Sequence, residues 1–180
     1  MQQEAAAQRS GPSKGVLAVY EWLEALGVAI IIAMLFFTFV VRVNAVKGDS
    51  MLPNYTDGMR VIVQAVGYQP KAGDVVVIDA TNTNLNEFVI KRIIATEGQT
   101  VDLDGAGNVY VDGALLDESA YLGLVPTYSH DVAFPQTVPE GCVFVLGDNR
   151  EVSTDSRSSD LGMVDARYAI GRVQFSFGGQ

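Results

Sequence analysis

The chain has 180 residues and a formal net charge of −9, and this length allows one modest domain with a further segment. All of the net charge lies after residue 43, because three basic and three acidic residues cancel before it. An acidic domain offers no basic surface to a polyanion, so nucleic acid is excluded as a partner.

The composition also limits the chemistry. The chain has one cysteine, Cys142, and one histidine, His130, so it cannot form an intrachain disulfide or a site built from several thiolates or imidazoles. His130 lies in the loop-like segment TYSHD, where we expect it at the surface. We therefore expect no metal and no cofactor.

The first predicted element is a membrane-spanning helix. The segment Ala25–Val41 reads ALGVAIIIAMLFFTFVV and shows no 3.6-residue periodicity of the kind that marks an amphipathic helix. With Leu23 and Val43 it reaches the roughly 20 residues that cross a bilayer. Tyr20 and Trp22 precede it, as interfacial aromatic residues often do.

A cleavable signal peptide is the alternative for this segment. Its apolar core would have about 7–15 residues and would end at a small-x-small site, whereas this core is longer and RVNAVKG matches such a site weakly. We therefore predict a short polar tail at residues 1–14, a retained anchor at 15–43 and a domain at 44–180. The basic residues do not decide which end of the helix faces the cytoplasm, since two of them lie on each side of the apolar segment.

Beyond residue 43 the sequence predicts a mainly β domain. Segments rich in valine, isoleucine, phenylalanine and tyrosine alternate with turns of glycine, proline, asparagine and aspartate. Residues 102–116 read as consecutive hairpins with turns at GAGN and DG. No crossover helix is indicated, so we expect an antiparallel, barrel-like or sandwich-like sheet. The expected strands are 59–66, 74–80, 87–95, 108–113, 142–148 and 168–177.

The first segment with possible chemistry is KGDSMLPNY, which begins at Lys47. Gly48 can take a positive φ, and Pro53 restricts the backbone after Ser50. Such a stiff turn presents the serine Oγ reproducibly and leaves nearby N–H groups free for an oxyanion. Ser50 is seven residues past Val43, so it lies within about 25 Å of that residue. By itself, however, a turn serine is usually structural.

The second segment is FVIKRIIA, in which alternation places Lys91 on one strand face with Val89 and Ile93. Burial between apolar neighbours would lower the pKa of the Lys91 amine, and a neutral lysine can serve as a general base. The alternative is a lysine on an edge strand that extends into water.

The third segment is the polar stretch LGDNREVSTDSRSSDLG, at residues 146–162. Its aspartates can cap turns, and Asp155 can pair with Arg157. Ser153 can hydrogen-bond a nearby amine. A solvated loop is the alternative here.

Together and in this order, these segments closely resemble the type I signal peptidases of the S26 family, which are membrane-bound Ser/Lys proteases. GDSMLP resembles the nucleophile box, GDVVVI the following strand box, IKRIIATEGQTV the lysine box and LGDNREVSTDSR the C-terminal box. The resemblance covers roughly residues 20–177. Asn54 and Tyr55 depart from it, since the family often has Thr-Leu there, and some members have a serine where this chain has Gly48.

The resemblance implies a role for each matching residue. Ser50 would be the nucleophile and Lys91 the general base, and the backbone N–H of Ser50, near Gly48, would hold the oxyanion. Ser153 would orient the lysine amine. The supporting residues would be Asp148, Asn149, Arg150, Asp155 and Arg157, and the substrate-binding residues Asp49, Met51, Val89 and Ile90.

The resemblance also implies a function. The protein would remove signal peptides from exported preproteins at Ala-X-Ala sites, as a single-span, Gram-positive-like membrane protein. We expect a monomer with a cytoplasmic N-terminus and an extracytoplasmic catalytic domain. The alternatives are a specialised processing peptidase of the same superfamily, a membrane-anchored β-domain that binds peptides without cutting them, and a self-cleaving regulator. The membrane span argues against the last.

Overall fold

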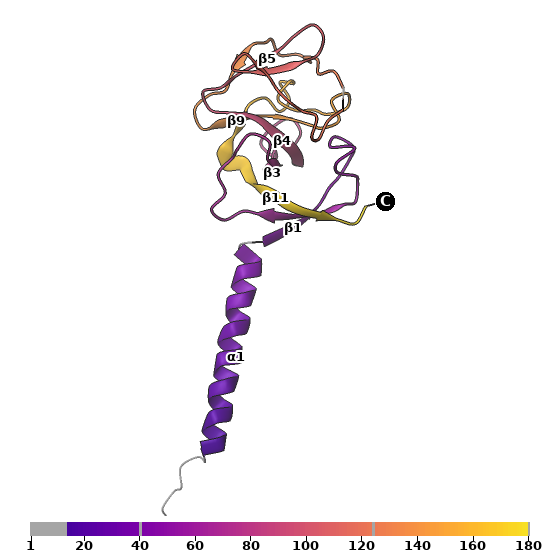
Figure 1. Ribbon diagram of the computed structural model, residues 1–180. Coiled ribbons are helices and arrows are strands. Elements are labelled where there is room, and N and C mark those ends of the chain that lie inside the picture. The colour runs from indigo at the N-terminus through magenta and orange to yellow at the C-terminus, as the bar shows by residue number, and fades with distance from the viewer. Residues whose placement is uncertain (1–13, 40, 124, 180) are drawn as a thin grey trace, which may run out of the picture. The chain divides into compact units, whose positions relative to one another are not determined.

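The computed structural model describes residues 14–39, 41–123 and 125–179 (Figure 1). The chain divides into two compact units, with the boundary between Thr38 and Phe39. The first unit holds helix α1, Lys14–Phe39, apart from its last residue. Its segment Lys14–Leu35 is long and apolar enough to cross a membrane, and its large apolar side chains are exposed, as in Ile31. This is compatible with a membrane anchor.

The end of the helix differs from the predicted anchor. Strand β1 already begins at Val41, because Val41–Ala45 pairs along its length with the edge of β2. Residues 41–43, which were predicted to belong to the anchor helix, are therefore part of strand β1. The polar tail predicted for residues 1–14 lies outside the described residues, apart from Lys14.

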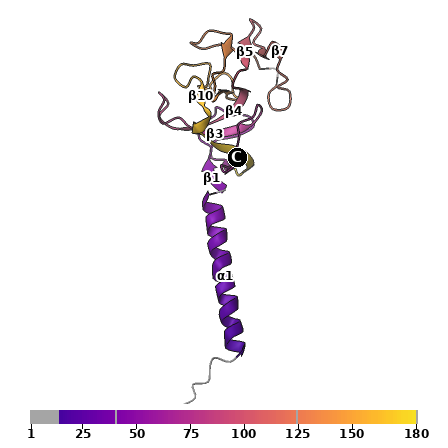
Figure 2. The same ribbon diagram turned by 90° about the vertical axis from the view of Figure 1, so that its left-hand side faces the viewer.

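The second unit is mainly β, and all its strand pairs are antiparallel, as predicted. A seven-stranded sheet has the order β1-β2-β11-β3-β4-β9-β10, and a four-stranded sheet has the order β7-β6-β5-β8. Strands β3 and β4 lie side by side near the middle of the larger sheet (Figure 2). The remaining elements are β2 (Arg60–Gln64), β3 (Val75–Asp79), β4 (Phe88–Thr96), β5 (Thr100–Leu103), β6 (Val109–Val111), β7 (Ala114–Leu115), β8 (Gln136–Thr137), β9 (Cys142–Leu146), β10 (Val164–Asp165), the 3-10 helix η1 (Ala166–Tyr168) and β11 (Ala169–Phe177).

The six predicted strands all form, within a few residues of their expected bounds. The predicted hairpins are β5-β6 and β6-β7, with turns at the expected GAGN and DG segments. The sequence analysis missed the short strands β1, β8 and β10. Two-residue strands such as β8 carry no alternation, so only their pairing partners reveal them.

Strand β4 is buried on both faces from Ile90 to Ala95. Ile90 packs in one apolar cluster with Val63, and Ile93 packs in a second cluster with Val145. The pairing of β4 with β9 shifts register between Ile93 and Ala95, so the regular alternation assumed from the sequence ends there. A strand buried on both faces holds its polar side chains away from water.

Candidate active site

Ser50 and Lys91 are in direct contact. The Nζ atom of Lys91 donates a hydrogen bond of 2.8 Å to Ser50 Oγ, across 41 residues of sequence. Ser50 lies in a turn closed by a hydrogen bond from the Leu52 N–H to the Asp49 carbonyl, 3.2 Å, and the next turn is closed by the Tyr55 N–H and the Met51 carbonyl, 2.9 Å. Before it, Gly48 has φ +79°, a conformation that favours glycine. The turn therefore presents the hydroxyl to the lysine amine.

Burial changes the chemistry of Lys91, which is only 3% exposed. Desolvation lowers the pKa of its amine to about 8, although the charges of Asp155 and Glu87 act in the opposite direction. The Lys91 amine is buried and bonded to Ser50, so the alternative of a lysine that extends into water is wrong. At about pH 8 a large fraction of this amine is neutral and can accept a proton.

The turn also leaves a donor free. The backbone N–H of Ser50 donates no hydrogen bond to any other residue in the described part of the chain. The N–H of Gly48 instead donates to Asp57 Oδ1 at 2.8 Å. Of these two groups, the Ser50 N–H is the one available to a developing negative charge.

The polar loop after β9 holds the Ser50 turn from the other side. The N–H of Asn149 donates to the Ser50 carbonyl at 3.0 Å, and its side-chain amide donates to the Asp49 carbonyl at 3.1 Å. Gly147 makes this approach possible, because a Cβ there would lie 2.1 Å from Ser153 Oγ and 2.5 Å from the Ser50 carbonyl oxygen. The sequence analysis missed Gly147, although a glycine directly after a buried strand can signal close backbone contact.

Ser153 lies in this contact without bonding Lys91. Its Oγ is buried and makes no well-formed hydrogen bond among the described residues. It does lie near enough to the Asp155 carboxylate to favour the charged form of that carboxylate, which lowers its pKa. The contact with the lysine amine that the resemblance implied is not formed in this structure.

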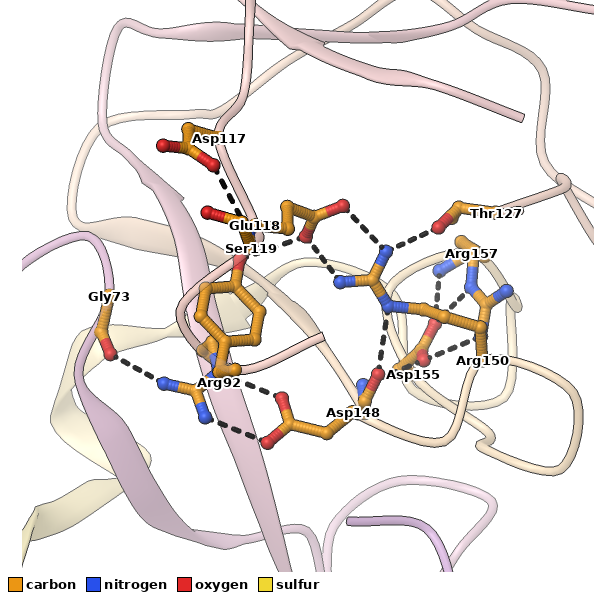
Figure 3. Close-up of polar contacts among 12 residues, drawn as sticks. Gly73, Arg92, Asp117, Glu118, Ser119, Thr127, Asp148, Arg150, Asp155 and Arg157 are labelled. Carbon is orange, nitrogen blue, oxygen red and sulfur yellow. Dashed lines mark hydrogen bonds and ion pairs between the residues drawn. The ribbon is translucent and has the colours of Figure 1, made fainter. Parts of the chain in front are cut away.

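Asp155 and Arg157 form the ion pair expected from the sequence. Arg157 Nε and Nη2 each donate to the Asp155 carboxylate at 2.8 Å, and both side chains are almost fully buried (Figure 3). Burial raises the pKa of this carboxyl, but the hydrogen bonds and charge of Arg157 outweigh burial and the pKa is lowered. The same carboxylate accepts the Gly147 N–H at 3.0 Å. The ion pair thus fixes the start of the loop.

A second buried pair joins the loop to β4. Arg92 Nε and Nη2 donate to the two oxygens of Asp148 at 2.8 and 2.7 Å, and Arg92 Nη1 donates to the Gly73 carbonyl at 3.0 Å (Figure 3). The Arg92 guanidinium also lies over the Tyr121 ring, 3.9 Å from its centroid. Arg92 was not predicted as a site residue, because its partner is 56 residues away.

Arg150 makes a third pair, with Glu118 (Figure 3). Its Nε donates to the Gly147 carbonyl at 3.0 Å, and its terminal nitrogens bond Glu118 and Thr127. The segment that contains Glu118 and Thr127 is therefore bound to the loop. No local signal in the sequence indicates either partner.

A groove of about 470 Å³ runs past the Ser50–Lys91 pair. Among the residues expected to bind substrate, Asp49, Val89 and Ile90 line it, whereas Met51 does not. The Met51 side chain is fully buried in an apolar cluster. The lining residues are Lys47, Gly48, Asp49, Ser50, Leu85, Glu87, Phe88, Val89, Ile90, Lys91, Val152 and Thr154.

The backbone of β4 is open on one side of this groove. β4 pairs with β3 over Phe88–Arg92, but its pairing with β9 begins only at Arg92. In the described part of the chain, Phe88–Lys91 therefore has no strand on its second side. Free N–H and C=O groups on such an edge can pair with an extended peptide. No group of three or more His, Cys, Asp or Glu among the described residues could hold a metal ion.

Comparison with known proteins gives consistent matches. The family model described as signal peptidase, peptidase S26, matches residues 19–178. Signal peptidase I of Bacillus licheniformis is 35% identical over 170 residues, which cover 89% of each chain. Signal peptidase IB of Staphylococcus aureus (strain COL) is 35% identical over 177 residues, covering 88% of this chain and 89% of that protein. The crystal structure of a signal peptidase I from Enterococcus faecalis V583 is 28% identical, with a TM-score of 0.47, and the match covers 59% of this chain and 98% of that chain.

Proposed function

The chain belongs to the signal peptidase family, peptidase S26, and we propose that it removes signal peptides from exported preproteins through a dyad of Ser50 and Lys91. Its relatives are signal peptidases I, which makes it a serine peptidase, a hydrolase. The observation that carries the dyad is the hydrogen bond from the buried Lys91 amine to Ser50 Oγ. A buried amine with a lowered pKa is the kind of base that a serine hydroxyl needs.

The proposed reaction has two acyl-transfer steps. Neutral Lys91 accepts the proton of Ser50 Oγ, which attacks the carbonyl carbon at the cleavage site. The backbone N–H of Ser50 stabilises the tetrahedral oxyanion. Protonated Lys91 then donates its proton to the leaving amine, and an acyl-enzyme ester remains on Ser50. Water, deprotonated by the same lysine, attacks the ester, and Ser50 leaves with the proton.

Substrate would bind as an added strand in the groove. The open edge of β4 at Phe88–Lys91 supplies backbone donors and acceptors, and Ser50 lies in the same groove. Val89 and Ile90 would contact small side chains, which fits an Ala-X-Ala sequence before the cut. Asp49 would lie along the other side of the peptide.

The remaining site residues would position the dyad. Asn149 holds the backbone of the Ser50 turn, and Asp148 and Arg150 hold the polar loop against β4 and the Glu118 segment. Asp155 and Arg157 brace the start of that loop. Ser153, whose buried hydroxyl makes no well-formed hydrogen bond among the described residues, would orient the Lys91 amine.

The protein would act at the membrane as a monomer. Helix α1 would cross the lipid bilayer, with the N-terminus in the cytoplasm and residues 44–180 outside the cell membrane as the catalytic domain. Signal peptides are themselves hydrophobic segments held in the bilayer, so an anchored enzyme would meet them there. The mechanism requires no cofactor.

Cleavage of a preprotein with an Ala-X-Ala site tests the dyad. Detergent-solubilised protein should release the mature product, and Ser50→Ala and Lys91→Met should each abolish release. Ser129→Ala and Lys71→Ala are the matched controls, since both residues are exposed and lie outside the groove. Product formation by either dyad variant at the wild-type rate would rule out the assignment.

A further inference from the structure

Asn54 makes two hydrogen bonds from one nitrogen. It lies four residues after Ser50 in the same turn, and its Nδ2 donates to Asp148 Oδ2 at 2.8 Å and to the Tyr121 carbonyl at 2.6 Å. A side-chain amide has two N–H hydrogens, and here each has its own acceptor. If the amide were turned by 180°, its oxygen would face the Asp148 carboxylate and the Tyr121 carbonyl, and three acceptors would meet with no hydrogen between them. Asn54 is therefore held in one orientation.

The carboxylate that Asn54 contacts also binds the strand of the proposed base. Asp148 Oδ2 accepts from Asn54 and from Arg92 Nη2, and Arg92 is the residue after Lys91 on β4. The contacts form a closed ring. The backbone of the turn joins Ser50 to Asn54, and hydrogen bonds join Asn54 to Asp148 and Asp148 to Arg92. The backbone of β4 then joins Arg92 to Lys91. The Lys91–Ser50 hydrogen bond completes the ring.

We propose that Asn54 is a positioning residue, which through Asp148 holds the turn of Ser50 at the distance from the Lys91 strand that proton transfer requires. The proposal rests on the proposed function of these two residues. Asn149 fixes the upstream side of the turn by binding the carbonyls of Asp49 and Ser50. Asn54 fixes the downstream side, so that the serine is held from both ends.

The chemistry of the side chain explains why asparagine is suited to this position. A serine or threonine hydroxyl has one hydrogen and cannot donate to two acceptors, whereas an amide has two. The Tyr121 carbonyl and the Asp148 carboxylate lie on separate segments, so the amide joins three parts of the chain. Both bonds therefore require a side chain with two hydrogens to donate.

The exposure of Asn54 makes the proposal testable. Asp148 and Arg92 are buried, at 1% and 8% exposure, and their replacement would leave an unpaired buried charge. Asn54 is exposed, belongs to no apolar cluster and does not line the groove. Its replacement therefore leaves the core and the peptide-binding surface in place.

The experiment measures kcat and KM of the full-length protein on the Ala-X-Ala preprotein. Asn54→Ala should lower kcat roughly tenfold, because a hydrogen bond to a charged group is lost, and should change KM by less than about twofold. Asn54→Asp should lower kcat further, since it places a second carboxylate against Asp148. Asn84→Ala is the matched control, because the Asn84 amide also donates to an aspartate, Asp160, but at the exposed surface.

The pH profile separates positioning from folding. A loosened turn admits water to Lys91, which raises the pKa of its amine from about 8, so the acidic limb of kcat should move to higher pH in Asn54→Ala. A lower melting temperature with wild-type kcat and pH profile would overturn the proposal, as would a raised KM with unchanged kcat. If Asn54→Ala does not fold, Asn54→Ser, which keeps one donor, is measured by the same criteria.

Different results would exclude the dyad and the positioning role of Asn54. If Ser50→Ala keeps its activity, the dyad itself is wrong. If Ser50→Ala is inactive while folded Asn54 variants match the wild-type protein in kcat and pH profile, only the positioning role is wrong.

Discussion

At the scale of single residues, Gly147 sets how closely the polar loop approaches the turn of Ser50. A Cβ at this position would meet the side chain of Ser153 and the backbone of Ser50, and backbone cannot move away cheaply. We expect Gly147→Ala to lower kcat roughly 100-fold, since a displacement of about 1 Å costs that much at a reacting centre. Gly105→Ala, where the new methyl group meets nothing within 4 Å, is the control. Wild-type kcat for both variants would contradict this account.

The ionisation of Lys91 should appear in the pH dependence of cleavage. Burial lowers the pKa of this amine to about 8, and only the neutral form can accept the serine proton. We therefore expect kcat/KM to rise roughly tenfold per pH unit below that value and to level off above it. A profile that stays flat down to pH ~6 would exclude Lys91 as the base.

At the scale of elements, β4 is the strand on which the site is built. It carries Lys91 and Arg92 next to each other, it is buried on both faces from Ile90, and its first half keeps an open edge toward the groove. A strand held this firmly by its neighbours can bury a lysine amine that would otherwise reach water. The position of β4 in the sheet, more than the identity of its residues, therefore accounts for the lowered pKa.

The loop after β9 depends on its buried ion pair, and two similar pairs allow a direct comparison. Asp155–Arg157 is buried, whereas Asp165–Arg167 has the same spacing but an arginine side chain that is 84% exposed. We expect Asp155→Ala to lower the free energy of unfolding by about 3–5 kcal/mol, because it leaves a buried guanidinium without a partner.

Asp165→Ala should lower the free energy of unfolding much less than Asp155→Ala, because water screens this pair and the main loss is the hydrogen bond by which Asp165 caps η1. Urea unfolding in detergent, followed by near-UV circular dichroism, measures both variants. Equal stabilities of the two variants would show that the buried pair does not hold the loop.

At the scale of the whole molecule, the chain divides into an apolar helix and a β unit at Phe39. We expect the full-length protein to stay in the membrane fraction after an alkaline carbonate wash, and a variant that begins at Phe39 to be released. The exposed apolar side chains of α1, including Trp22 at 78% exposure, would hold the full-length protein in the lipid, and the shortened variant lacks them. Release of the full-length protein would contradict the anchor.

The proposed orientation can be tested with a single thiol. Cys142, the one cysteine of the chain, is replaced by serine, and the exposed Ser129 is replaced by cysteine. A membrane-impermeant maleimide should then label intact cells. Labelling only after cell lysis would place the β unit in the cytoplasm.

Features that depend on residues close together in the chain could be predicted from the amino-acid sequence. The apolar run of α1, the β-rich segment of β4, the hairpin turns at GAGN and DG, and the Asp155–Arg157 pair, two residues apart, are all local, and each is present in the structure. The resemblance over four short segments then identified Ser50 and Lys91 as candidates, and the structure places them 2.8 Å apart.

Contacts between residues far apart in the chain became known from the three-dimensional structure alone. The Arg92–Asp148 pair joins residues 56 apart, Arg150 and Glu118 are 32 apart, and Asn54 and Asp148 are 94 apart. Met51 looked like a groove residue from its place beside Ser50, yet it packs into the core. Local patterns cannot reveal such contacts, because a side chain's partner depends on how the strands fold back on one another, and burial depends on all the segments around it.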